Sequence, residues 1–195
     1  MFSCVSLSAS GQFQTAVILD ATGNGEGFIW TSSDFGQTWD DTWSSNNGTS
    51  YQWTAVSISA SGQYQTAVQA LGDVYRSFDF GLTWNKIGVG SYYWTSISVS
   101  ATGQYQSACV GANGTKGYVW TSTDFGNTWV KLTDLGEEYW FSVSVSATGQ
   151  YQCAVVFGGD IYSSIDFGNS WSSSGFASYW QSISVSGSGQ YISVV

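Results

Sequence analysis

The acidic residues of this chain are the ones that most readily suggest catalysis. Glycoside hydrolysis needs two carboxyl groups that face each other across the scissile bond, one as the acid and one as the nucleophile or base. Six acidic residues fall in segments that differ from one part of the chain to the next: Glu26, Asp40, Asp41, Asp134, Glu137 and Glu138. No spacing marks any two of them as a pair. We interpret them as solvated loop residues, so the sequence predicts no catalytic residue.

The composition also restricts other chemistry. The chain has no histidine, so a serine or cysteine nucleophile would lack its usual base. The three cysteines, Cys4, Cys109 and Cys153, are too scattered for a disulfide scaffold or a zinc set. We expect them to be small buried residues on strands. No loop has the ligand spacing of a calcium site, and the sequence predicts neither a metal nor a cofactor.

The charge balance excludes two classes of partner. The chain has 13 acidic and 4 basic residues, for a net charge of −9. Binding to nucleic acid or to an anionic membrane surface depends on clustered Lys and Arg, which are absent. No apolar run reaches the roughly 18–20 residues of a membrane-spanning helix. We therefore expect no nucleic-acid partner and no membrane insertion.

Charged residues make up only 9% of the chain, against roughly 25% in an average soluble domain. Such a composition favours an extracellular or surface-associated protein. The first residues, MFSCVSLSASGQFQ, lack the basic and apolar regions of a signal peptide and have the pattern of a strand. We expect a secreted protein whose signal is not part of this chain.

Two sequence motifs alternate along the chain, which indicates that the chain is built from repeated structural units. The first is SSDFGQTW at 32–39, with further copies at 77–84, 122–129 and 164–171. The second contains Gly-Gln-Tyr or Gly-Gln-Phe, and its glycines are Gly11, Gly62, Gly103, Gly149 and Gly189. Recurrence at about 40–50 residues is typical of propeller blades.

Each period is consistent with four strands. In the third period, residues 94–100, 104–110, 118–123 and 128–132 alternate in polarity or are rich in β-branched and aromatic residues. Turn sequences separate them at 102–103, 111–117 and 124–127. The sequence predicts an all-β propeller of four-stranded antiparallel blades over residues 1–195. The expected blades are about 1–50, 51–91, 92–138 and 139–177, followed by a half blade at 178–195 made of a first and a second strand.

The eight-residue motif resembles the Asp-box, S/T-x-D-x-G-x-T-W, of BNR-repeat and sialidase-like propellers, including several non-catalytic ones. The resemblance implies a structural turn between the third and fourth strands, away from the ligand site. The residues that match are Asp34, Gly36, Trp39, Asp79, Gly81, Trp84, Asp124, Gly126, Trp129, Asp166, Gly168 and Trp171. Asp accepts hydrogen bonds within a tight turn and Gly supplies a positive φ. We expect the tryptophans to begin the outer strand and to pack between sheets.

The second motif is also interpreted as structural. Its glycine would turn the first hairpin of each blade, and its aromatic residue would bury a ring. These aromatic residues are Phe13, Tyr64, Tyr105, Tyr151 and Tyr191.

The opposite face of the blades carries loops that vary, and variable loops on a repeated scaffold often bind ligands. Aromatic residues end each linker, and Trp53, Trp94, Trp140 and Trp180 could stack on sugars there. The alternative is that they fill the gaps between blades. Two N-glycosylation sequons, at Asn47 and Asn113, fall in the same loops.

Sialidase activity does not fit the residues. The resemblance to sialidases implies a cluster of three arginines around the substrate carboxylate, together with a tyrosine nucleophile and a glutamate. This chain has a single arginine, Arg76. The leading hypothesis is a non-catalytic surface propeller that acts as a structural or recognition module. The alternatives are a lectin-like propeller that binds glycans and a glycoside hydrolase that uses loop carboxylates.

The phase of the repeat raises a further question, because the pattern begins on a first strand and ends on a second strand. The chain could be part of a longer array, or its ring could close with a two-stranded blade. A third possibility is that the open strand edge pairs with another copy of the chain, since unpaired edges promote association.

Overall fold

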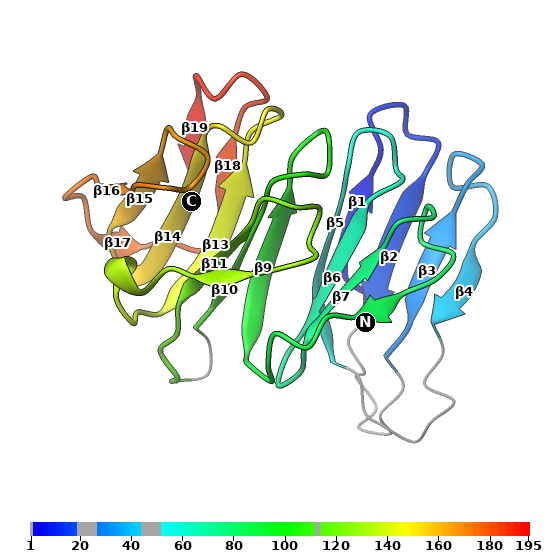
Figure 1. Ribbon diagram of the computed structural model, residues 1–195, viewed down its shortest axis with the longest axis horizontal. Helices are drawn as coiled ribbons and strands as arrows, with labels where there is room; N and C mark the ends of the chain where they lie inside the picture. The colour runs from blue at the N-terminus through cyan, green and yellow to red at the C-terminus, as the bar shows by residue number, and fades with distance from the viewer. Residues whose placement is uncertain (1, 19–26, 44–51, 112–113) are drawn as a thin grey trace. The chain divides into compact units, whose positions relative to one another are not determined.

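The computed structural model describes residues 2–18, 27–43, 52–111 and 114–195 (Figure 1). The regular secondary structure of the described residues is almost entirely β-strand, with one short 3₁₀ helix, η1, at Thr133–Leu135. It forms two compact units, Met1–Trp94 and Thr95–Val195.

The first unit contains two antiparallel sheets of four strands in sequence order. Blade 1 is formed by β1 (Phe2–Leu7), β2 (Gln14–Ile18), β3 (Ile29–Ser32) and β4 (Asp40–Trp43). Blade 2 is formed by β5 (Trp53–Ile58), β6 (Gln65–Gln69), β7 (Val74–Ser77) and β8 (Asn85–Lys86). Each strand pairs with the next one along the chain, so successive strands of a blade are antiparallel neighbours.

The second unit contains two more four-stranded blades and a half blade. Blade 3 is formed by β9 (Trp94–Val99), β10 (Gln106–Val110), β11 (Val119–Ser122) and β12 (Val130–Lys131). Blade 4 is formed by β13 (Trp140–Val145), β14 (Gln152–Gly159), β15 (Ile161–Ser164) and β16 (Ser172–Ser173). The half blade is formed by β18 (Ile183–Val185) and β19 (Ile192–Val194). The predicted four complete blades and two-stranded half blade are confirmed.

Two details of the strands were not expected. The outer strands begin one residue after the motif tryptophan rather than at it, as Trp84 and Asn85 illustrate. The strand β17 (Ser178–Tyr179) pairs with the long strand β14 instead of joining the half blade.

The core lies between neighbouring blades within each unit, and the alternation of the strands explains why. In blade 2 a row of paired residues runs across three strands, with Val56 opposite Ala67 and Ala67 opposite Tyr75. This row packs with Val17 and Ile29 of blade 1 in one apolar cluster. Residues directly opposite on neighbouring strands share one face, so blade 2 presents one apolar row to blade 1.

Candidate functional site

The repeated Asp corners are built around a carboxylate that accepts hydrogen bonds from its own turn. In blade 2 the Ser77 hydroxyl donates to Asp79 Oδ1 at 2.7 Å, and the Thr83 amide donates to the same oxygen at 2.9 Å. The Thr83 hydroxyl donates to Asp79 Oδ2 at 2.6 Å. The Gly81 amide closes the turn on Ser77 Oγ at 2.9 Å. The same bonds surround Asp34, Asp124 and Asp166.

These bonds stabilise the ionised carboxylates. The backbone amide of Thr38, followed by its hydroxyl, lowers the pKa of Asp34 to about 2. The hydroxyl and amide of Ser170 lower the pKa of Asp166 to about 2. At Asp79 and Asp124 partial burial raises the pKa, but the threonine and serine donors outweigh it and the net pKa is lowered. Each carboxylate therefore forms these hydrogen bonds within its own corner, and they favour its ionised form.

Two consecutive left-handed residues form each corner, which the sequence analysis recognised only in part. In blade 2, Phe80 has a φ of 64° and Gly81 a φ of 85°. This pair of positive φ values is typical of a type I′ turn. The Phe80 amide donates to the carbonyl of Gln63 in the first hairpin of the same blade at 3.3 Å. Equivalent bonds from Phe35, Phe125 and Phe167 join the two repeated motifs in the other blades.

The motif tryptophans attach to the corner glycines. The indole N–H groups of Trp39, Trp84 and Trp171 donate to the carbonyls of their corner glycines at 3.0–3.2 Å. Trp84 is buried between the blades of the first unit, whereas Trp39 and Trp171 are half-buried. Among the described residues, Trp129 Nε1 has no hydrogen-bond partner.

A buried glutamine, which the sequence analysis did not single out, connects neighbouring blades. The side-chain amide of Gln65 donates to the Gly62 carbonyl at 3.0 Å, and its oxygen accepts the Thr15 hydroxyl of blade 1 at 2.6 Å. In the second unit Gln152 accepts the Ser107 hydroxyl of blade 3 at 2.7 Å. The only sign of this role in the sequence was that a glutamine recurs directly after the aromatic residue of the second motif. The residue that bonds to it lies about one repeat away, so the local sequence does not reveal the contact.

The aromatic residue of the second motif packs on the next hairpin. A Cβ atom added to Gly62 would lie 2.6 Å from Phe13 Cβ, and one added to Gly149 would lie 2.5 Å from Tyr105 Cβ. The rings of Phe13, Tyr64, Tyr105 and Tyr151 are half-buried. The prediction of a buried ring is wrong for Tyr191, which is 66% exposed because no later hairpin lies against it among the described residues.

Three of the four linker tryptophans are buried, which agrees with the gap-filling alternative of the sequence analysis rather than with sugar stacking. Trp53, Trp94 and Trp140 have no exposed area, so they cannot stack on a sugar. Trp53 packs edge-on against Tyr75 and Trp140 packs edge-on against Tyr162. These rings begin the first strand of a blade and fill the space between sheets. Trp180 is half-buried against the half-blade core, and Asn47 and Asn113 lie outside the described residues.

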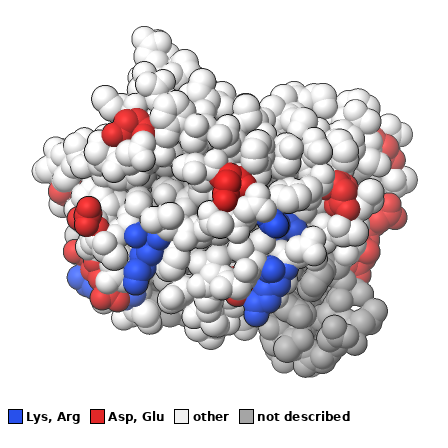
Figure 2. Space-filling view, viewed as in Figure 1, with Lys and Arg blue, Asp and Glu red and all other residues white. Residues whose placement is uncertain are grey.

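The loop carboxylates lie in separate environments. Glu138 accepts a hydrogen bond from Lys116 at 2.9 Å, Asp134 lies in η1, and Asp40 and Asp41 lie on β4. Glu137 is exposed, and Glu26 lies outside the described residues. Figure 2 shows acidic and basic side chains as small spots on a largely uncharged face.

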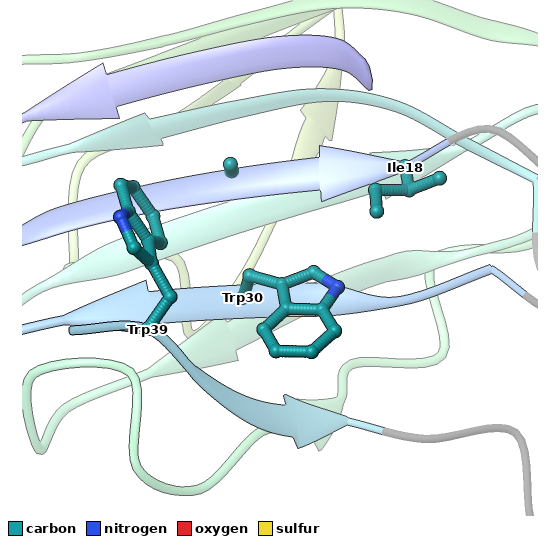
Figure 3. A pocket seen from close by; sticks show the side chains of 4 residues that line it. Ile18, Trp30 and Trp39 are labelled. Carbon is teal, nitrogen blue, oxygen red and sulfur yellow. The ribbon is translucent and has the colours of Figure 1, made fainter. Parts of the chain in front are cut away.

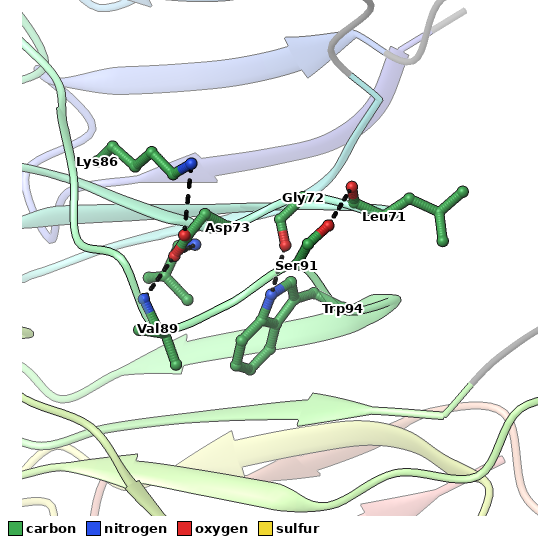
Figure 4. Close-up of polar contacts among 8 residues, drawn as sticks. Leu71, Gly72, Asp73, Lys86, Val89, Ser91 and Trp94 are labelled. Carbon is green, nitrogen blue, oxygen red and sulfur yellow. Dashed lines mark hydrogen bonds and ion pairs between the residues drawn. The ribbon is translucent and has the colours of Figure 1, made fainter.

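A buried carboxylate that the sequence analysis missed lies in blade 2. Asp73 Oδ1 accepts the amides of Val74 and Val89 at 2.8 and 2.9 Å, and Lys86 Nζ lies 3.7 Å from Asp73 Oδ2 (Figure 4). Nearby, the Ser91 hydroxyl donates to the Leu71 carbonyl. These contacts fix the loop between β6 and β7 to the linker after β8. We therefore interpret Asp73 as a residue that stabilises these loops.

The cysteines are free thiols. Cys109 and Cys153 are buried, as predicted, and Cys4 is half-buried. Burial raises the pKa of Cys109 to about 12 and that of Cys153 to about 11. Over the described ranges, no group of three or more His, Cys, Asp or Glu residues is arranged to hold a metal ion. No helix in the same ranges is long and apolar enough to span a membrane.

A surface groove is present in the described part of each unit. The groove in blade 1 has a volume of about 500 Å³ and is lined by Ala16, Ile18, Trp30 and Trp39 (Figure 3). The groove in the second unit has a volume of about 420 Å³ and lies beside η1, with Lys131, Asp134 and Trp171 among its lining residues. The first is apolar, and the second is mixed in polarity.

Comparison with known proteins shows what these features are similar to. Residues 29–42 match the model of the BNR-Asp box repeat. A comparison with curated proteins gives no match. Solved structures share the fold, among them the crystal structure of a nidogen/laminin complex, with a TM-score of 0.69, 9% identity, and coverage of 94% of this chain and 68% of that one.

Two GH74 structures are also similar. The GH74 enzyme of Niastella koreensis has a TM-score of 0.62 and 13% identity, with 94% of this chain and 42% of that chain covered. The GH74 xyloglucanase of Xanthomonas campestris has a TM-score of 0.72 and 14% identity, with 98% and 34% covered. The present chain therefore spans less than half of either GH74 chain. The chain has a β-propeller fold, and its residues 29–42 match an Asp-box repeat, as the sequence predicted.

Proposed function

We propose that the protein is a non-catalytic propeller module at a cell, particle or extracellular surface, where it acts as a structural or recognition unit. The main support for the proposal is that the repeated polar side chains are hydrogen-bonded to other residues of the scaffold. Asp, Ser and Thr of each corner bond to one another, and the buried glutamines bond across blades. Residues held in this way support a scaffold role rather than a catalytic one.

The remaining chemistry supports the same proposal. Arg76 Cζ lies 4.4 Å from the centre of the Phe78 ring, which favours a packing role for the one arginine. The raised pKa values of Cys109 and Cys153 favour inert buried thiols over nucleophiles. The low charge of the chain favours a surface location.

The likeness to GH74 enzymes favours one rival, a glycoside hydrolase that uses loop carboxylates. The two are separated by incubating the purified chain with a panel of chromogenic glycosides and xyloglucan. We expect no turnover. Turnover that is lost in Asp134→Asn or Glu137→Gln, with an unchanged melting temperature, would overturn the proposal and establish the enzyme.

A glycan array divides the proposal into its two branches. Saturable binding to one glycan class, competed by that free glycan, would identify a recognition module of the lectin type. The absence of binding, combined with the absence of turnover, supports the structural unit.

A further inference from the structure

We propose that the groove beside η1 in the second unit is a binding site for a neutral sugar, held as a single ring or as the end of a longer glycan. This inference rests on the recognition branch of the proposed function and gives that branch a location. The groove lies between blades 3 and 4, and the residues that line it come from 130–135 and 169–171. It therefore lies inside one unit and includes no residue of the half blade.

Hydrogen bonds fix both walls of the groove. On the side of blade 3, the Gly136 amide closes η1 on the Thr133 carbonyl at 3.0 Å. On the side of blade 4, the Ser170 amide donates to Asp166 Oδ1 at 2.9 Å as part of the corner. A site whose walls are already fixed loses little conformational entropy when a ligand binds.

The groove has an apolar part that includes an aromatic ring. Leu132, Leu135 and Trp171 are half-buried and pack against the core of the second unit. The Trp171 indole N–H donates to the Gly168 carbonyl at 3.1 Å, which fixes the orientation of the ring. Indole rings carry an electron-rich face, and the weakly positive C–H groups on the flat side of a pyranose pack favourably against such a face.

The equivalent tryptophan of blade 2 has different surroundings. Trp84 also donates its indole N–H to its corner glycine, at 3.0 Å, but it is only 6% exposed and belongs to the core of the first unit. Trp171 has the same attachment and retains exposed surface along the groove. The corner therefore holds the indole in either case, and part of the Trp171 surface is available to a ligand.

Polar side chains in the groove have unused hydrogen-bonding capacity. Asp134 on η1 and Lys131 on β12 are exposed, and among the described residues no hydrogen bond or ion pair involves either charged group. Lys131 Nζ lies 4.6 Å from the centre of the Tyr118 ring, a contact that restrains the lysine side chain. Asn169 donates its side-chain N–H to the Asp166 carbonyl, which leaves its amide oxygen as an acceptor.

This set of groups fits a neutral sugar better than a charged ligand. A carboxylate and an ammonium line the same groove, so an ion of either sign would meet a like charge as well as an opposite one. Sugar hydroxyls both donate and accept, and they match Asp134, Lys131 and Asn169 together. The volume of about 420 Å³ lies within the roughly 300–1,000 Å³ of small-molecule sites. One or two sugar rings combine an apolar side with several hydroxyls, as this groove requires.

An NMR titration of the full chain tests the site. The probes are the methyl glycosides of glucose, galactose, mannose, xylose and N-acetylglucosamine, together with cellobiose, lactose and sialyllactose. At least one neutral probe is expected to bind with a dissociation constant on the order of 1 mM. It is also expected to shift the indole N–H signal of Trp171, which is identified by its loss in Trp171→Phe. Sialyllactose, which carries a carboxylate, is expected to bind no more tightly than lactose.

Matched substitutions locate the site. Asp134→Asn is expected to weaken binding of the best neutral probe about tenfold, because a neutral acceptor replaces a charged one. Glu137→Gln is the control, since Glu137 is equally an exposed acid near η1 but does not line the groove, and its affinity should be unchanged. Trp171→Ala is expected to abolish measurable binding, whereas Trp171→Phe should retain part of it because a smaller ring still stacks.

A second tryptophan separates loss of binding from loss of stability. Trp84→Ala removes a buried indole from the equivalent corner, so it should lower the melting temperature without changing the affinity of the folded protein. Circular dichroism and the melting temperature check that every variant is folded under the conditions of the titration.

Three results would overturn the inference. They are the absence of binding by every probe at concentrations well above the expected dissociation constant, tighter binding of sialyllactose than of lactose, and binding that Asp134→Asn and Glu137→Gln affect equally. Glycoside turnover is measured separately, so each of these results would leave the non-catalytic role standing. Turnover would overturn the proposed function whichever way the titrations come out.

Discussion

Blades 1 and 2 contain the same row of residues in different surroundings. Val56, Ala67 and Tyr75 of blade 2 lie in the core of the first unit. Val5, at the equivalent position of blade 1, is largely exposed. The difference arises from the neighbouring sheet rather than from the strand itself. It follows that a repeat sequence specifies what a blade can bury, and the preceding blade determines whether it is buried.

The largest expected effect tests the same comparison in the second unit. Trp140 is fully buried and Trp180, its equivalent in the half blade, is half-buried. We expect Trp140→Ala to lower the free energy of unfolding by about 3–5 kcal/mol, and Trp180→Ala to cost clearly less. Urea denaturation with a two-state fit over each unit measures both. Equal losses would show that these tryptophans do not fill comparable inter-blade positions.

A pair of hairpin glycines sharpens the comparison within the first unit. Gly11 and Gly62 have φ values of 75° and 83°, so alanine at either position should cost about 1–2 kcal/mol. At Gly62 the new Cβ would also collide with Phe13, which adds about 1–3 kcal/mol. Thermal unfolding of the two variants should therefore separate them. If Gly11→Ala were as damaging as Gly62→Ala, the assignment of Phe13 as an inter-blade contact would fail.

The corner carboxylates predict a loss of stability in acid. The pKa values of Asp34 and Asp166 are lowered from 3.8 to about 2. A lowered pKa in the folded state contributes stability that is present above the unfolded value and is lost as the pH falls through the folded value. The melting temperature should therefore fall between about pH 4 and pH 2. Asp34→Asn and Asp166→Asn should reduce this dependence, whereas Asp40→Asn, outside the corners, serves as the control.

The smallest expected effect concerns the left-handed phenylalanines. Phe80 contacts Phe13 of blade 1 with ring centres 4.5 Å apart, so Phe80→Asn should lose about 0.5–1.5 kcal/mol. Phe35 is 60% exposed with a φ of 65°, and asparagine tolerates that conformation better. Phe35→Asn in dilute solution should therefore be neutral or stabilising by up to about 1 kcal/mol. Calorimetry that shows equal losses at both positions would contradict this contrast.

Local features of the fold could be predicted from the sequence. Strand alternation, the turn glycines and the Asp-box residues depend on neighbours a few positions away, so their spacing determines the sheets and corners. The boundaries were less accurate, since β17 pairs with β14 across a linker. A pairing of that kind depends on how the linker lies in space, which no local pattern records.

The particular partners of side chains between blades could not be predicted. Gln65 looks like a surface residue in sequence, yet it is buried because Thr15, fifty positions earlier, supplies a hydroxyl. From the sequence, Trp53 could stack on a ligand, but in the structure its side chain has no exposed area. Phe80 gave no sign of a positive φ, because bulky residues rarely adopt one without a compensating contact. Each of these roles is fixed by a partner outside its own turn or strand.

The most direct measurement of the central claim compares Ile58→Ala with Leu7→Ala by equilibrium unfolding in dilute solution. The two residues have equivalent positions, but Ile58 is 7% exposed and Leu7 is 58% exposed. We predict a loss of about 2–5 kcal/mol for Ile58→Ala and a change within about 0.5 kcal/mol for Leu7→Ala. Equal changes at the two positions would contradict the view that the preceding blade determines what each repeat buries.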